Sequence, residues 1–234
     1  MIVVKKSPEP PSLKKSRETM EGQVQKALRE NLTIELLKKS AKPKNPTGVL
    51  EIKLNDDLYK PSEAKARLIL DHLGKCAYCE TRFMDTAGGD VEHFRPKKGF
   101  NEYDRVSASG LGPRTKLGYF FLAYSWDNHL WSCKECNEAY KKNYFGVMPD
   151  MSAPPERDEF GSETDFQEAF DEWAKAMTKH SEWTSGSTLT EESILIDPSK
   201  ENPREHIQFD PQTGYAVGAQ LDDKGKLIAP SHRG

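Results

Sequence analysis

The residues with the clearest capacity for chemistry are four cysteines, which stand in two Cys-x-x-Cys pairs. Cys76 and Cys79 form the first pair, and Cys133 and Cys136 form the second, with 53 residues between the pairs. A two-residue gap lets one tight turn direct two thiolates at one ion, and two such turns complete a tetrahedral site. Because a closed set of four soft thiolates suits structural zinc, we expect a Zn²⁺ site that pins the two segments together. Disulfides, a redox pair and an iron–sulfur cluster are the alternatives.

Polar residues suited to catalysis lie between and beside these pairs. Residues 88–98 read Gly-Gly-Asp-Val-Glu-His-Phe-Arg-Pro-Lys-Lys, residues 126–137 read Trp-Asp-Asn-His-Leu-Trp-Ser-Cys-Lys-Glu-Cys-Asn, and Lys141 follows. Taken singly, each has an ordinary structural explanation: a histidine beside a glutamate is usually a surface pair, Asn128 suits a turn, and Asn137 suits a helix N-cap. Their combination between two candidate zinc turns favours a functional site.

Together these segments resemble the motif of HNH endonucleases, and the likeness covers about residues 75–145. More narrowly, the sequence resembles the PtuB-like HNH subunits of Septu-type and retron-associated antiphage systems, through residues 1–6, 75–80 and 196–199. The resemblance implies an α+β fold. Its centre would be a ββα-metal (HNH, treble-clef-like) core with a four-cysteine zinc knuckle, flanked by N-terminal helices and a C-terminal α/β extension. It also implies that related chains continue beyond Gly234.

The resemblance further implies a role for each matching residue. His93 matches the general base that activates water, and Glu92 beside it matches a ligand of the catalytic Mg²⁺ or Mn²⁺. Asn137, at the last motif position, matches the second metal ligand. Asn128 matches the central asparagine that braces the loop around the base. His129 stands where the family more often has an apolar residue, and we expect a structural or substrate-side role for it.

The same residue types suit phosphodiester hydrolysis on chemical grounds. Histidine is a base near neutral pH, and a divalent cation stabilises charge on the phosphate and the leaving oxygen. Carboxylate and amide oxygens are hard ligands that suit Mg²⁺ or Mn²⁺. We therefore expect an endonuclease that cleaves DNA, with RNA or tRNA as the alternative substrate. A zinc-stabilised binding module without activity is the hypothesis from a different class.

The predicted nucleic-acid contacts are four basic residues near this motif: Arg95, Lys97, Lys98 and Lys141. Residues 93–118 carry six Lys or Arg against two Asp or Glu. Such a segment can contact phosphates, although an ordinary solvated loop is the alternative. Nothing in the sequence indicates which bases would be read.

The elements that must position these residues follow from hydrophobic spacing. Helix formers predominate in residues 13–40, and residues 49–54 alternate as in a strand. Pro61 and Ser62 mark the start of a helix, and Gly74 marks its end. The other expected elements are a buried aromatic segment at 119–124, a helix from Cys136 onward, a helix over 166–180, and strands at 195–198, 207–210 and 215–217.

We divide the chain into three parts by composition. Residues 1–60 form a predicted extended and helical docking region, residues 61–147 the zinc-stabilised HNH domain, and residues 148–234 an acidic linker with an accessory region. Residues 1–145 carry 26 Lys or Arg against 19 Asp or Glu, whereas residues 146–234 carry 8 against 18. This asymmetry favours a polyanion as partner of the basic part and another partner for the acidic part, unless both surfaces are simply solvated.

The expected partners and location come from the resemblance and from hydropathy. The resemblance implies an ABC/SMC-like ATPase (PtuA-like) as a protein partner and, in some systems, a retron reverse transcriptase with its RNA–DNA product. No apolar run approaches the roughly 20 residues that span a bilayer. We therefore expect a soluble, cytoplasmic protein without a membrane partner.

Overall fold

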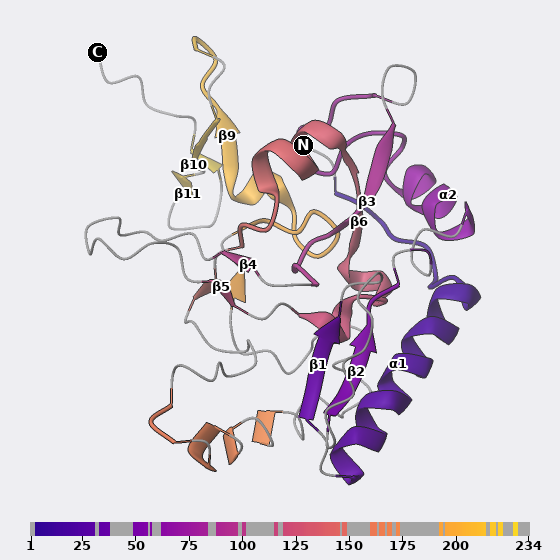
Figure 1. Cartoon of the computed structure of the whole chain (residues 1–234). Helices are drawn as coiled ribbons and strands as arrows, with labels where there is room; N and C mark the ends of the chain where they lie inside the picture. Colours follow the sequence, from indigo (N-terminus) through magenta and orange to yellow (C-terminus); the bar gives the residue numbers. More distant parts are fainter. Residues whose placement is uncertain are drawn as a thin grey trace.

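The computed structural model combines helices with two-stranded sheets, so a mixed α/β class is confirmed (Figure 1). It describes residues 3–30, 33–37, 49–55, 57, 62–83, 88–97, 100–101, 115–116, 119–145, 147–148, 160–162, 164–166, 168–169, 172–173, 192–193, 195–213, 216–218, 220–221 and 227–228. None of the helices in these ranges is both long enough and apolar enough to cross a membrane.

The N-terminal part consists of a helix beside a parallel pair of strands. Helix α1 (Pro11–Arg29) begins at a proline, which suits the first helical position. Strand β1 (Thr33–Leu37) pairs in parallel with β2 (Val49–Lys53), and the pair lies along α1 (Figure 1). The strand predicted at 49–54 is confirmed.

The prediction of helix across residues 13–40 is wrong at residues 33–37, and residues 31–32 and 38–40 lie outside the described residues. Residues 33–37 form β1, whose Ile34 and Leu36 lie opposite Leu50 and Ile52 of β2. Helix formers such as Leu and Glu tolerate a strand when a partner strand pairs with them, so strand pairing overrides propensity here.

Helix α2 (Ser62–Asp71) begins and ends as its sequence signals predict. Beyond its end, Gly74 has a φ of 70°, and its N–H donates to the carbonyl of Ile69 at 2.8 Å. This left-handed glycine cap satisfies a carbonyl of the last turn and directs the chain into the first cysteine pair. Helix α2 packs on β3 and β6, the strands that carry the candidate site.

The site region has the order strand, strand, helix. Strand β3 (Gly89–His93) pairs antiparallel with β6 (His129–Cys133), so that His93 lies opposite His129 and Gly89 opposite Cys133. The next element is η5 (Glu135–Lys141), a π-helix, which confirms the helix predicted after Cys136. Its wide last turn closes through the Lys142 N–H, which donates to the carbonyl of Asn137 at 2.7 Å.

One aromatic-rich core underlies these elements. The predicted buried aromatic segment is confirmed: it contains the 3-10 helix η3 (Phe120–Leu122), and all of residues 119–126 are buried. Trp126 and Trp131 are buried in the same core, and Leu13 and Met20 of α1 reach it too. Residues from the first two predicted parts thus share one core, and the three-part division stays a prediction.

The segment before α1 is extended and lies against the same region. The ammonium of Lys6 donates to the carbonyl of Trp126 and, at 2.6 Å, to that of His129. The indole N–H of Trp126 donates to the Ser7 carbonyl at 2.7 Å, and the Ser7 N–H donates to Asp71 at 2.8 Å. Burial lowers the pKa of Lys6 to about 8. The N-terminus therefore holds the start of β6 in place.

The C-terminal part contributes short strands. Strands β9 (Ile207–Phe209) and β10 (Ala216–Gly218) confirm two predicted positions. The strand predicted at 195–198 is wrong, because Asp197 begins a turn there in which its carbonyl accepts the Lys200 N–H. The helix predicted over 166–180 lies mostly outside the described residues. The remaining short elements are β4 (Phe100–Asn101), β5 (Thr115–Lys116), η4 (Trp126–Asn128), β7 (Val147–Met148), β8 (Glu192–Ser193), η7 (Pro203–Glu205), β11 (Gln220–Leu221) and β12 (Leu227–Ile228).

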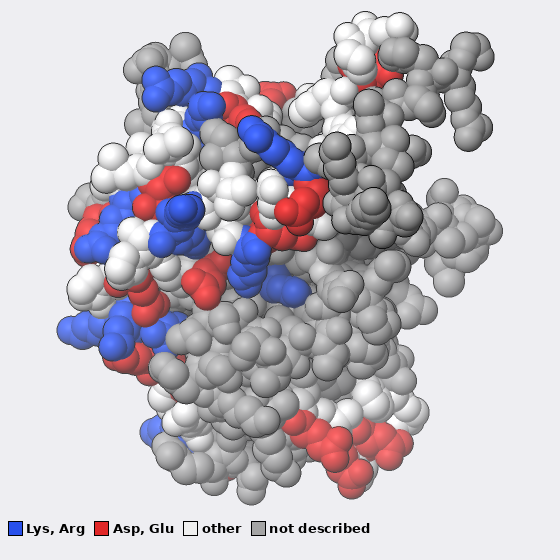
Figure 2. All heavy atoms as spheres, turned by 180° about the vertical axis from the view of Figure 1, so that it is seen from behind, with Lys and Arg blue, Asp and Glu red and all other residues white. Residues whose placement is uncertain are grey.

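Charges are interspersed on the face seen in Figure 2, where basic and acidic side chains alternate over much of the described surface. Acidic side chains gather at the lower right of this view. Among residues 164–173, Asp165, Glu168 and Glu172 are described, and no basic residue occurs in that stretch of sequence. This agrees with the acidic character of residues 146–234.

We predict that Gly89→Ala destabilises the fold. A Cβ at Gly89 would lie 2.4 Å from Phe83 and 2.5 Å from Trp131, whose stacked rings line the pair β3–β6. Overpacking of this kind costs about 1–3 kcal/mol in the free energy of unfolding. The neighbouring Gly88→Ala is the matched control, because a Cβ there meets nothing within 4 Å. Equal denaturation midpoints for the two variants would contradict the packing described here.

Candidate functional site

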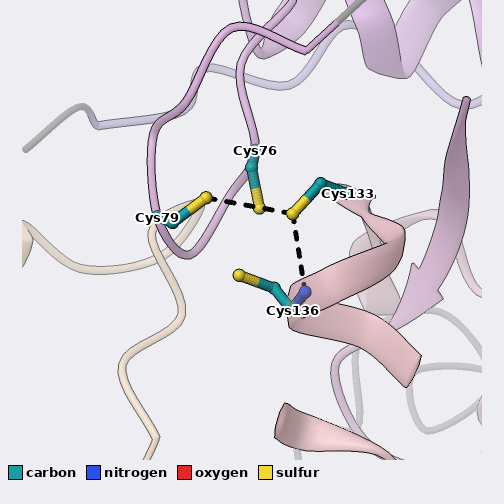
Figure 3. Close-up of side chains that lie close together, drawn as sticks. All are labelled: Cys76, Cys79, Cys133 and Cys136. Atoms are coloured by element: carbon teal, nitrogen blue, oxygen red, sulfur yellow. Dashed lines mark hydrogen bonds between the residues drawn. The ribbon is translucent and has the colours of Figure 1, made fainter. Parts of the chain in front are cut away.

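The four cysteines converge as their spacing predicts. Their sulfur atoms all lie within 4.8 Å of one another, with Cys76 and Cys79 on one turn and Cys133 and Cys136 at the junction of β6 and η5 (Figure 3). Zinc–sulfur bonds of about 2.3 Å in a tetrahedron place the sulfurs about 3.8 Å apart. The sulfurs of Cys79 and Cys133 are 3.9 Å apart. The cluster could therefore bind a zinc ion.

Backbone N–H groups donate hydrogen bonds to two of these sulfurs, which favours the thiolate form. The N–H of Tyr78 donates to the sulfur of Cys76 at 3.4 Å, and the N–H of Cys136 donates to that of Cys133 at 3.5 Å. Burial opposes ionisation of Cys76, but backbone N–H groups and the Ser132 hydroxyl lower its pKa to about 7. Burial and the neighbouring Cys76 raise the pKa of Cys136. Close thiolates repel one another, and a divalent cation removes that repulsion.

A cavity of about 270 Å³ lies between residues of β3, the segment after it and η5. Its lining includes Glu92 and His93 of β3, Asn137 and Lys141 of η5, and Lys97. Three residues predicted for the catalytic centre and two predicted for phosphate contact thus face one cavity, although they come from segments about 40 residues apart. The antiparallel pairing of β3 with β6, followed at once by η5, brings them together.

His93 is buried at the end of β3, and contacts of its imidazole ring hold the side chain in place. Its Nε2 lies 3.0 Å from the carbonyl oxygen of Ala123 and 3.3 Å from Nε2 of His129, and the two rings meet edge to face. Burial, then the positive charge of Lys97, lowers the pKa of His93 well below its ordinary value. The imidazole is therefore neutral at pH 7, the state in which it can accept a proton.

Glu92 is also buried, and its carboxylate accepts hydrogen bonds from Lys141, Tyr78 and the backbone N–H of His93. The ammonium of Lys141 lies 2.5 Å from Oε1, and the hydroxyl of Tyr78 donates to the same oxygen at 3.3 Å. Burial raises the pKa of Glu92, and the Lys141 ammonium opposes this rise. The Lys141 ammonium thus partly neutralises the carboxylate, and its Nζ also donates to the His93 carbonyl at 3.1 Å.

Asn128 connects the segment that follows His93 to the segment that precedes β6. Its Oδ1 accepts the Arg95 N–H at 2.8 Å, and its Nδ2 donates to the carbonyls of Arg95 and Leu122 at 3.0 and 3.2 Å. Its own carbonyl accepts the N–H of Phe94 at 2.9 Å. The side chain is buried and joins the loop that follows His93 to the segment before β6, and its role in catalysis stays a prediction.

The basic residues predicted to contact nucleic acid are placed differently from one another. Lys97 lines the cavity, and Lys141 is paired with Glu92. The guanidinium of Arg95 packs over the ring of Tyr119 at 5.0 Å and that of Phe145 at 5.3 Å. Lys98 lies outside the described residues. A contact with nucleic acid stays a prediction for all four.

Comparison with known proteins gives a close relative. Septu protein PtuB from Bacillus mycoides (strain KBAB4) is 31% identical over 193 residues, which cover 81% of this chain and 54% of that protein. This chain is therefore similar to a Septu PtuB protein. It spans about half the length of this curated relative. No family model matches the chain, and no solved structure matches it significantly.

The likeness to Septu protein PtuB confirms the resemblance to PtuB, while the HNH motif and the link to retrons stay predictions. The ββα-metal fold, the catalytic roles and the Mg²⁺ or Mn²⁺ site stay predictions. Sequence reasoning missed Tyr78 and the Ala123 carbonyl as neighbours of the site. The only signal for Tyr78 was its place between two cysteines, and the Ala123 carbonyl had none, because a backbone group leaves no trace in residue type.

We predict that the purified chain holds about one zinc ion and loses it when a cysteine of the cluster is replaced. Cys136→Ser removes one sulfur from the site, and the three remaining ligands bind the ion more weakly. Because structural zinc contributes directly to folding, the melting temperature should fall with the zinc content. Elemental analysis and thermal denaturation measure both. A wild-type protein without zinc, or a Cys136→Ser variant with the full amount, would contradict the assignment.

Proposed function

We propose that this chain is a metal-dependent HNH endonuclease that hydrolyses phosphodiester bonds as the effector of a Septu-type antiviral defence system. The cavity that Glu92, His93 and Asn137 line together is the observation that carries the proposal. The likeness to Septu protein PtuB supports the biological setting. DNA is the proposed substrate, and RNA is the alternative because the same chemistry hydrolyses either backbone.

In this proposal His93 is the general base. If Nε2 carries the ring proton and donates to the Ala123 carbonyl, then Nδ1 carries the lone pair that accepts a proton from water. Burial keeps the ring neutral at pH 7, so the lone pair is available, and the negative charge of a phosphate beside it would raise the lowered pKa toward the range that suits a general base. Asn128 fixes the loop that follows His93, and the edge-to-face contact with His129 restricts the ring. Both residues position the base.

Glu92 and Asn137 are the proposed ligands of the catalytic cation. Their carboxylate and amide oxygens are hard donors, the kind that suit Mg²⁺ or Mn²⁺, and both line the cavity. A divalent cation held there would stabilise charge on the phosphate and on the leaving oxygen. Lys97 lies on the same cavity and would contact the phosphate from another side.

We further propose an ABC/SMC-like ATPase as the partner that controls cleavage, and a retron reverse transcriptase as an additional partner in some systems. The predicted docking region, residues 1–60, and the acidic residues 148–234 are the proposed contact regions. The uneven charge of the chain supports two different kinds of partner, because residues 1–145 are basic and residues 146–234 are acidic.

We predict that His93→Ala abolishes cleavage. Removal of a general base lowers the rate about 10²- to 10⁴-fold. Labelled DNA and RNA are incubated with the protein in complex with its ATPase partner and Mn²⁺, and phage protection is scored in cells. His206→Ala is the matched control, since His206 is half-exposed and pairs with Glu201 away from the cavity. Full activity in the His93→Ala variant would overturn the catalytic assignment.

We also predict that Lys141→Met makes stability dependent on a divalent cation. The change leaves the buried Glu92 carboxylate without its charge partner, which costs about 3–5 kcal/mol in buffer without added Mn²⁺ or Mg²⁺. Mn²⁺ should then raise the melting temperature of the variant more than that of the wild type, because the cation replaces the ammonium. No chelator is used, so that the four-cysteine cluster keeps its zinc. Lys142→Met is the control, an exposed neighbour whose loss should leave the stability in this buffer unchanged. Equal stability of Lys141→Met and wild type without added cation would argue against the buried pair.

A further inference from the structure

We propose that Tyr78 is a positioning residue for Glu92, so that the four-cysteine cluster orients a ligand of the catalytic cation. The inference rests on the proposed function and extends it. The hydroxyl of Tyr78 donates to Glu92 Oε1 at 3.3 Å. Tyr78 lies between two cysteines of the cluster, and its own N–H donates to the sulfur of Cys76. One residue therefore contacts both centres, through its backbone on one side and its side chain on the other.

The contact restricts how the carboxylate can rotate. Lys141 and Tyr78 both donate to Oε1 of the Glu92 carboxylate, and the backbone N–H of His93 donates to the same carboxylate. A carboxylate held by several donors has little freedom to turn about its last bond. Tyr78 is the donor that comes from the cysteine turn. Partners of this kind that hydrogen-bond to a metal ligand typically change metal affinity by about 10- to 100-fold.

The turn that carries Tyr78 is itself fixed on the strands of the site. The N–H of Ala77 donates to the carbonyl of Trp131 at 2.8 Å, and the sulfur of Cys76 lies 3.6 Å from the Ser132 hydroxyl. Both partners lie on β6, which pairs with the strand that carries Glu92. The distance between the Tyr78 hydroxyl and Glu92 is thus set by the docking of the cysteine turn on β6. Opening of the cluster would release this contact.

The test removes a single oxygen atom. Tyr78→Phe keeps the ring, the backbone N–H and all four cysteines, so the fold and the zinc content should not change. We expect Mn²⁺ binding to the full chain, measured by calorimetry or electron paramagnetic resonance without nucleic acid, to weaken about tenfold. Cleavage at subsaturating Mn²⁺ should fall in parallel and recover at high Mn²⁺. Tyr140→Phe is the matched control, because Tyr140 is 68% exposed on η5.

Three outcomes are informative. Weaker Mn²⁺ binding in Tyr78→Phe, with unchanged zinc content and melting temperature, supports the inference, since a merely structural role would lower stability instead. Equal Mn²⁺ affinity in Tyr78→Phe and the wild type would overturn this inference and leave the proposed function standing. A wild-type protein that binds no Mn²⁺ and cleaves no nucleic acid would overturn the proposed function, and the role of Tyr78 with it.

Discussion

The candidate site depends on the cluster of four cysteine sulfurs, which brings together two turns that are far apart in the sequence. The turns are separated by 53 residues, and the strand that carries Glu92 and His93 lies within that interval. The register of β3 against β6 places Gly89 opposite Cys133, so the cluster lies at the same end of the strand pair where β3 begins. A constraint at that end fixes the register along the whole pair, because a slip of one residue would turn every side chain to the opposite face.

The opposite end of the pair is held by different forces. Lys6 donates to the carbonyl of His129, and Asn128 binds the backbone of Arg95 on the neighbouring segment. These are hydrogen bonds to backbone groups in a buried region, where an unmade bond would be costly. The strand pair is therefore held by the cysteine sulfurs at one end, and by the Lys6 ammonium and the Asn128 amide at the other. His93 lies next to the second end, and its ring is held within a few ångströms of the Ala123 carbonyl.

Much of this arrangement follows from spacing, and the rest follows from contacts that spacing cannot encode. The two Cys-x-x-Cys pairs predicted the cluster, and Pro61, Ser62 and Gly74 predicted the helix before it. The strand at 33–37 was not foreseen, because its Leu and Glu residues suit a helix until β2 pairs with them. The partners of Arg95 and Lys141 were also not foreseen. A basic residue near a motif shows its charge in the sequence, but whether it meets a phosphate, an aromatic ring or a carboxylate depends on packing.

Lys141 can have both the partner that the sequence predicts, a phosphate, and the partner that the structure shows, Glu92. In the folded chain its ammonium neutralises a buried carboxylate, which keeps Glu92 from being a lone charge in a region of low dielectric. If Glu92 binds a divalent cation, the ammonium and the cation compete for the same carboxylate, and two positive charges side by side repel each other. An incoming phosphate offers the ammonium a second partner across the same cavity. A phosphate near both charges would offset their repulsion, so in the proposed function cation binding and nucleic-acid binding favour each other.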